Sequence, residues 1–180
     1  MKTLSEHLTQ YAAYHRDQRN IITHLVGIPM IVLAVVTLLA RGSWMVGEVP
    51  VTVATVLTVL TCLFYIVLDR PLGVLMSLLL AVVHQAGHAF AQWSFMAWLG
   101  MGLGLFVLGW AIQFLGHYFE GKKPAFVDDI TGLIIGPLFV VTELVFALGM
   151  RRDLRHTIES QVGPVRTMPK RQSASDPASS

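Results

Sequence analysis

The sequence predicts an all-α fold: a polytopic membrane helical bundle with four transmembrane helices, one re-entrant or fifth spanning segment and an N-terminal amphipathic helix. Of the 180 residues, 54% are hydrophobic and only 13% are charged, whereas soluble domains are about half apolar and about a quarter charged. A hydrocarbon core of roughly 30 Å needs about 20 consecutive apolar residues per helix. Four runs approach this length: residues 21–40, 51–68, 72–91 and 95–115.

The first element, residues 1–19, is predicted to be an amphipathic helix because Leu4, Leu8 and Tyr11 recur at three- and four-residue spacing. This helix would either lie on the membrane surface or cap the bundle as a soluble element. Turn-forming residues separate the runs that follow, at 41–44, 47–50, 69–71 and 121–124. No small-residue cleavage site follows the first run, so it is not expected to be a cleaved signal peptide.

The last apolar segment, residues 130–150, is interrupted by Pro137 and carries Glu143, which favours a re-entrant or surface-lying hairpin. Residues 1–150 would form one membrane-embedded domain, and the polar residues 151–180 a disordered tail. The lysines and arginines near the ends of the first four runs would all lie on one side. They predict an integral protein, expected in a bacterial inner membrane, whose N-terminus and whose run ends near residues 15–24 and 113–120 are cytoplasmic.

Several function classes are disfavoured by the composition. The net charge is only +2 and forms no basic face, so nucleic acid is not an expected partner. Cys62 is the only cysteine, which excludes an intrachain disulfide and a cysteine-based metal cluster. The expected partners are membrane lipid and a second copy of the chain. A glycine seam on the fourth run would let another helix approach closely: Gly102, Gly109 and Gly116.

Two clusters of metal-binding residue types stand at the ends of apolar runs, where they are costly and therefore point to function. In each cluster, pairs three or four residues apart share a helix face. His15 and His24 are nine apart and lie on opposite faces of a straight helix, so they can meet only if the chain bends between them. Asp17 to Asn20 is the expected place, with Asn20 as the N-cap of the first spanning helix. The clusters are Tyr14, His15, Asn20 and His24, and then Gln113, His117 and Glu120.

Imidazoles with a carboxylate suit Fe(II), Zn or Mn, and two histidines with one carboxylate suit non-haem Fe(II) oxygen chemistry. The alternative is that these histidines only form hydrogen bonds at helix ends. His84 and His88 also have metal-ligand spacing, but they would lie near the other membrane face. For this pair a second polar site, a haem ligand or simple packing stays open. Glu143 could equally bond within the bundle.

The two clusters together resemble a known family. The matching pattern is Tyr11-x-x-Tyr14-His15-x4-Asn20-x3-His24, then Trp110-x-x-Gln113-Phe-x-Gly116-His117-x-x-Glu120-x3-Pro124-Ala125-x-x-Asp128, then Pro137 and Glu143. It is similar to the small membrane dioxygenases that carry out α-oxidation of 2-hydroxy fatty acids. Two departures stand out: the eukaryotic pattern has one more residue between the histidine and the glutamate, and an asparagine where Asp129 stands.

The resemblance implies an Fe(II)-dependent enzyme whose substrates are a 2-hydroxy fatty acid and O₂, and which shortens the acid by one carbon. It implies His15, His24 and His117 as iron ligands, with Glu120 as the carboxylate ligand or a residue that orients the ligands. A haem-binding protein or a non-enzymatic membrane protein with structural histidines is the alternative. The further candidates are Asn20 and Tyr14 for catalysis, and Lys122, Lys123, Gln113 and Asp128 for substrate binding.

Overall fold

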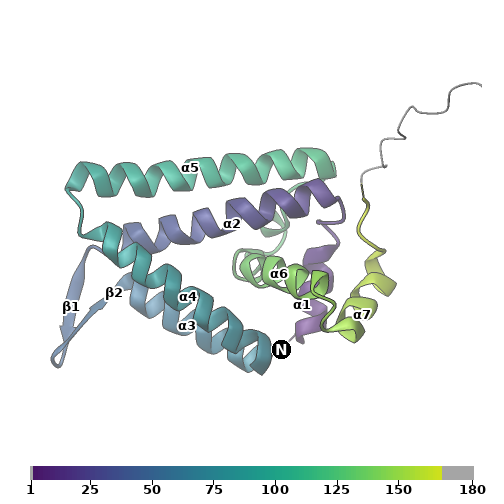
Figure 1. Ribbon diagram of the computed structural model, residues 1–180, viewed down its shortest axis with the longest axis horizontal. Helices are drawn as coiled ribbons and strands as arrows, with labels where there is room; N and C mark the ends of the chain where they lie inside the picture. Colours follow the sequence, from purple (N-terminus) through teal and green to yellow (C-terminus); the bar gives the residue numbers. More distant parts are fainter. Residues whose placement is uncertain (1, 168–180) are drawn as a thin grey trace, which may run out of the picture.

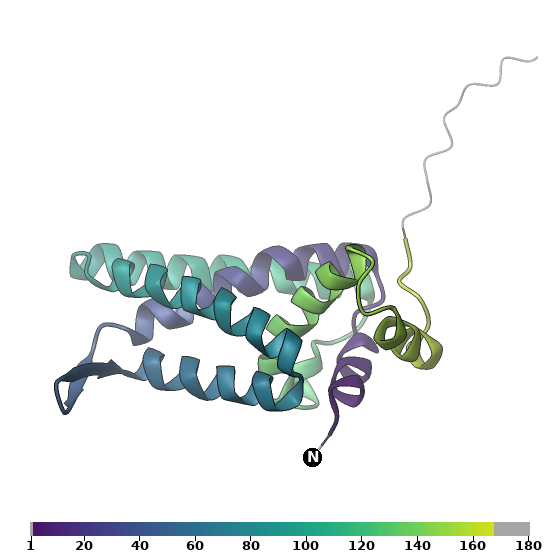
Figure 2. The same ribbon diagram turned by 60° about the horizontal axis from the view of Figure 1, so that its bottom comes forward.

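The computed structural model describes residues 2–167, which form seven α-helices, one 3-10 helix and one antiparallel hairpin. The elements in chain order are α1 (Leu4–Ala12), α2 (Gln18–Leu39), β1 (Ser43–Val46), β2 (Val49–Thr52), α3 (Val53–Leu68), α4 (Arg70–Ala91), α5 (Phe95–Glu120), η1 (Ala125–Val127), α6 (Gly132–Ala147) and α7 (Arg152–Val162). Helices α2 to α5 run side by side along the molecule (Figures 1 and 2). The hairpin lies at one end, and α1, α6 and α7 gather toward the other.

The prediction of a helical membrane protein is confirmed in its main feature, since the described residues are mostly helical, but they also contain one β-hairpin, and the predicted number of spans is not confirmed. Three helices are long and apolar enough to cross a membrane: α2, α4 and α5. Helix α3 has 16 residues, fewer than the about 20 that a span needs. Helices α6 and α7 are bent by 114° relative to each other and could form a fourth span only as a broken pair. The interruption predicted at Pro137 is wrong, because α6 continues through Pro137 and Glu143 and the break lies between Ala147 and Arg152.

The glycine seam packs against α2, as predicted, and α5 makes its most extensive contact with that helix. A Cβ on Gly102 would meet Leu38, and one on Gly109 would lie 2.7 Å from Ile31 Cγ1 and 3.0 Å from the carbonyl oxygen of Gly27. At Gly116 a Cβ would collide with the side chains of Asn20 and Thr23. The missing side chains therefore let the two helices that carry His24 and His117 approach each other closely.

Other boundaries differ from the predictions. Helix α1 ends at Ala12 instead of continuing to residue 19, and it contacts α6 and α7, so it caps the bundle. The turns predicted at 41–44 and 47–50 and the start of the span predicted from residue 51 are replaced by a hairpin: β1 and β2 pair around Gly47, whose positive φ of 61° suits a hairpin turn. The disorder predicted after residue 150 is wrong for residues 152–162, which form α7. The part of that prediction that concerns residues 168–180 lies outside the described residues.

Gly109→Ala should lower the melting temperature of the purified protein by several degrees, because a methyl group there must displace Ile31 or the backbone of Gly27, and overpacking costs about 1–3 kcal/mol. Gly104→Ala on the same helix is the matched control, since a Cβ there meets nothing within 4 Å among the described residues. Thermal unfolding in detergent micelles measures both variants. Equal melting temperatures for the two would contradict the close approach of α2 and α5.

Candidate metal centre

The chain bends between α1 and α2, and the bend brings His15 toward α2. Helix α1 ends at Ala12, and α2 begins after Asp17, whose carboxylate accepts the backbone N–H of Arg19 at 2.9 Å. A bend between His15 and His24 is therefore present, but it lies at residues 13–17 and not at the predicted place between Asp17 and Asn20: Asp17 is the N-cap, and Asn20 lies inside the helix. An aspartate suits this position because its carboxylate satisfies a free N–H of the first turn.

Glu120, the last residue of α5, accepts hydrogen bonds from the residues of the bend. Its Oε2 atom accepts the backbone N–H groups of Arg16 and Asp17 at 3.0 and 2.7 Å and the Asn20 side-chain amide at 3.1 Å. Its Oε1 atom accepts from the guanidinium of Arg166 at 2.8 Å. Both oxygens of this buried carboxylate are thus occupied by nitrogen donors.

Arg166 belongs to residues 163–167, here called the C-terminal strap, which pass over the bend. The Arg166 backbone N–H donates to the carbonyl of Arg16 at 2.7 Å, and its carbonyl accepts from the N–H of Gln18 at 3.1 Å. The Arg16 guanidinium donates to the carbonyl of Gly163 at 3.2 Å and pairs with Glu143 of α6 at 3.3 Å. The disorder predicted from residue 163 onward is wrong for the strap, because its backbone pairs with the bend.

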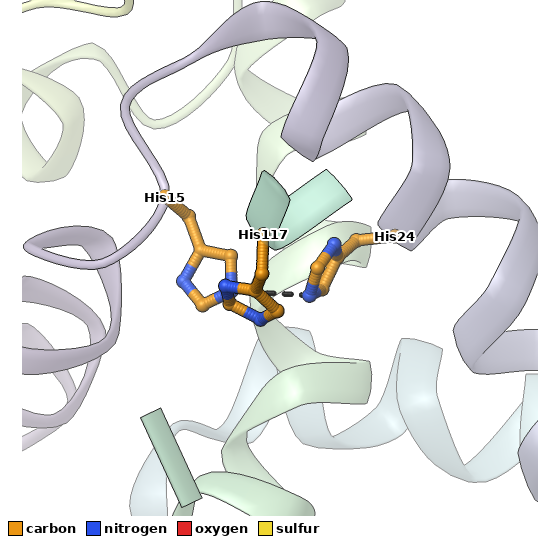
Figure 3. A group of neighbouring side chains, drawn as sticks. All are labelled: His15, His24 and His117. Carbon is orange, nitrogen blue, oxygen red and sulfur yellow. Dashed lines mark hydrogen bonds between the residues drawn. The ribbon is translucent and has the colours of Figure 1, made fainter. Parts of the chain in front are cut away.

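His15, His24 and His117 meet in one buried group, here called the histidine centre (Figure 3). One ring nitrogen from each residue lies within 4.8 Å of those of the others. The three side chains come from the bend, from α2 and from the last turns of α5. Burial holds the pKa of His15 well below its ordinary value, and the nearby His24 acts in the same direction, so the neutral ring that a metal needs is the favoured form.

The backbone partners fix the tautomers of two of these rings. His15 Nδ1 lies 2.7 Å from the carbonyl oxygen of Tyr11, and His24 Nδ1 lies 2.8 Å from that of Asn20. A carbonyl oxygen only accepts, so both Nδ1 atoms carry the proton and both Nε2 atoms carry a lone pair. These Nε2 atoms lie 3.1 Å apart. Two facing lone pairs repel, whereas a shared metal ion would be bound by both.

The third ring adds an unsatisfied group. His117 Nδ1 is buried and has no hydrogen-bond partner within residues 2–167. Imidazole nitrogens suit Fe, Zn, Cu and Ni. The three histidines therefore fit a metal ion by their geometry and by their unused lone pairs. The 3.1 Å gap between His15 and His24 leaves no room for a planar haem between those two rings.

A cavity of about 70 Å³, here called the head cavity, opens beside His24 and His117. Gln113 lines it and is 4% exposed, and neither polar atom of its amide has a partner among the described residues. Tyr11 also lines the cavity and stacks on His15 with ring centroids 4.2 Å apart. Tyr11 was part of the recognised motif without a predicted role; its four-residue spacing to His15 was the available signal.

The remaining candidates lie outside the head cavity. The Tyr14 hydroxyl donates to Asp128 at 2.7 Å, and Lys123 pairs with the same carboxylate at 2.6 Å. These two partners hold the pKa of Asp128 below its ordinary value, with Lys123 the stronger influence. Lys122 donates to the carbonyl of Ala13 at 2.7 Å. The four side chains thus tie the segment after α5 to the bend.

His84 and His88 do not join the histidine centre. Both lie on α4 toward the hairpin end, with ring centroids 4.4 Å apart. His84 Nδ1 lies 3.3 Å from the Thr58 hydroxyl, and His88 Nε2 lies 3.4 Å from that of Thr52. These contacts agree with the packing alternative for the pair. Glu143 bonds within the bundle, to Arg16.

Comparison with known proteins identifies the family of this chain. A family model described as 2-hydroxy-palmitic acid dioxygenase Mpo1-like matches residues 1–148, which include all three histidines. The chain is 32% identical over 168 residues to the 2-hydroxy-palmitic acid dioxygenase MPO1 of Saccharomyces cerevisiae, with 87% of each chain covered. No solved structure matches. The chain belongs to the Mpo1-like family.

Proposed function

We propose that this protein is an Fe(II)-dependent dioxygenase that shortens 2-hydroxy fatty acids by one carbon at the histidine centre. The observation that carries the proposal is the facing pair of Nε2 atoms, 3.1 Å apart, with His117 beside them. The name of the yeast relative supports the substrate class. Zinc has no redox chemistry, so among the metals that imidazole binds, iron suits a reaction with O₂.

Two of the three histidines, His15 and His24, are held in place before any metal binds. The carbonyls of Tyr11 and Asn20 keep His15 and His24 with Nε2 directed at the centre; such partners fix the tautomer and orientation of a ligand. Bound there, Fe(II) would supply the site at which O₂ and the hydroxy acid react. Because Glu120 already accepts from four nitrogen donors, we assign it the positioning of the bend and not a place among the ligands.

The substrate head would occupy the head cavity. The Gln113 amide offers one acceptor and two donor hydrogens, which match a carboxylate and a 2-hydroxyl group. Tyr11, with its ring on His15, closes the cavity on the side of α1. Lys122 and Lys123 immediately precede the 124–126 segment of the cavity wall, so we assign them the attraction of the carboxylate toward the cytoplasmic membrane face.

His24→Ala and His117→Ala should each lower the iron content and the conversion of 2-hydroxypalmitate by more than about 100-fold, since replacing even a residue that only orients a ligand costs about 10–100-fold. Elemental analysis of the purified protein and chromatography of the shortened product measure the two effects. His84→Ala is the matched control and should retain both. Full iron content and turnover in the His24 and His117 variants would refute the assignment.

The role of Glu120 can be separated from that of a ligand. Glu120→Ala leaves two backbone N–H groups of the bend unpaired, each at a cost of about 1–3 kcal/mol, and should lower iron affinity by about 10–100-fold. Glu120→Gln keeps an oxygen that accepts from the bend, so it should retain most of the iron. Iron titration of both variants is the measurement. If Gln abolishes iron binding as fully as Ala, the carboxylate is a ligand.

A further inference from the structure

A second, larger space adjoins the head cavity. It has a volume of about 480 Å³ and lies between α2, α3, α5 and α6. Its walls are aliphatic and aromatic side chains, apart from the hydroxyls of Thr58, Thr61 and Tyr65. This space is here called the apolar groove. Because it offers almost no hydrogen-bonding groups, its occupant must be apolar.

The head cavity and the apolar groove are neighbours that share five wall residues. Ile31, Val32, Trp110, Leu133 and Pro137 line both spaces. A molecule whose polar end lies beside Gln113 and His117 would need to pass only these shared side chains to extend into the groove. The unpaired Gln113 amide lies at the polar end of this path. Most of the volume of the path belongs to the apolar groove.

One face of α2 lines the whole path. The side chains at three- and four-residue spacing share that face, and they pass from the histidine centre to the end of the groove: His24, Ile28, Ile31, Val35 and Leu39. Figure 1 shows α2 extending from the end where α1 lies to the hairpin end. From His24 to Leu39 the helix rises about 22 Å at 1.5 Å per residue.

This length identifies the kind of chain that would fit. Each leaflet of a bilayer contributes half of a hydrocarbon core of about 30 Å, so a membrane acyl chain extends over about 15 Å. The path along α2 is long enough to hold such a chain with its head at the histidine centre. At the far end, Leu39, Val36 and Ala54 line the groove, and Leu39 packs against the buried group that includes the other two.

We infer that the apolar groove binds the alkyl chain of the 2-hydroxy acid and that Val35, Leu39 and Ala54 set the preferred chain length. The inference rests on the proposed function for the identity of the head group. It does not rest on turnover, because binding of the chain can be measured without reaction.

Val35→Trp tests the inference, since a bulky ring at this point of α2 shortens the space beyond Ile31. Binding of 2-hydroxypalmitate and of 2-hydroxyoctanoate to the full chain in lipid nanodiscs would be measured by calorimetry, without O₂. The preference of the parent protein for the longer acid should fall by about 10-fold or more, because each buried methylene contributes to binding. The matched control is Leu60→Trp on α3, whose side chain is 57% exposed and lies outside the groove.

The outcomes separate the two proposals. Loss of the chain-length preference in Val35→Trp but not in Leu60→Trp supports the groove, even if the parent protein shortens no hydroxy acid, which would refute only the proposed function. A parent protein that binds the two acids equally, or a Val35→Trp variant with unchanged preference, overturns the inference and leaves the groove to bilayer lipid. Turnover with an unchanged preference refutes the groove and leaves the proposed function standing.

Discussion

The Glu120 carboxylate is the contact on which the histidine centre depends. His15 can meet His24 only if the chain leaves the helix between them, and a bend frees backbone N–H groups that are costly to bury unpaired. Glu120 accepts two of these groups and the Asn20 amide. Since it follows His117 by three residues on α5, the turn that supplies the third histidine also fixes the position of the other two.

The buried Glu120 carboxylate carries a negative charge, which the N–H groups of the bend do not neutralise. The C-terminal strap supplies a positive partner, Arg166. Arg166 pairs with Glu120 Oε1 at 2.8 Å, and its backbone pairs with Arg16 and Gln18. The strap and α7 lie beyond residues 1–148, which the family model matches. The three histidines therefore lie within the matched region, whereas Arg166, which bonds to Glu120 and to the backbone of the bend, lies outside it.

Predictions from the sequence were most accurate where the helical repeat alone decides which residues share a face. The spacing of His15 and His24 required a bend, and the glycine seam required a close helix, because both follow from 3.6 residues per turn. Glu120 could not be assigned from spacing alone, since only the folded chain shows that its oxygens accept from the bend. The strap was missed because its order comes from backbone pairing with Arg16 and Gln18, which composition does not encode.

The unsatisfied groups gather where binding is proposed. Among the described residues, six buried side-chain atoms lack a hydrogen-bond partner, and four of them belong to Asn20, Gln113 and His117. Each such atom costs about 1–3 kcal/mol, and the facing Nε2 atoms add repulsion. None of the residues that line the apolar groove is among those with an unpaired buried side-chain atom. Ligands that bond to these atoms remove this cost and so stabilise the folded state. Metal and substrate binding is therefore coupled to the stability of the bend that positions His15.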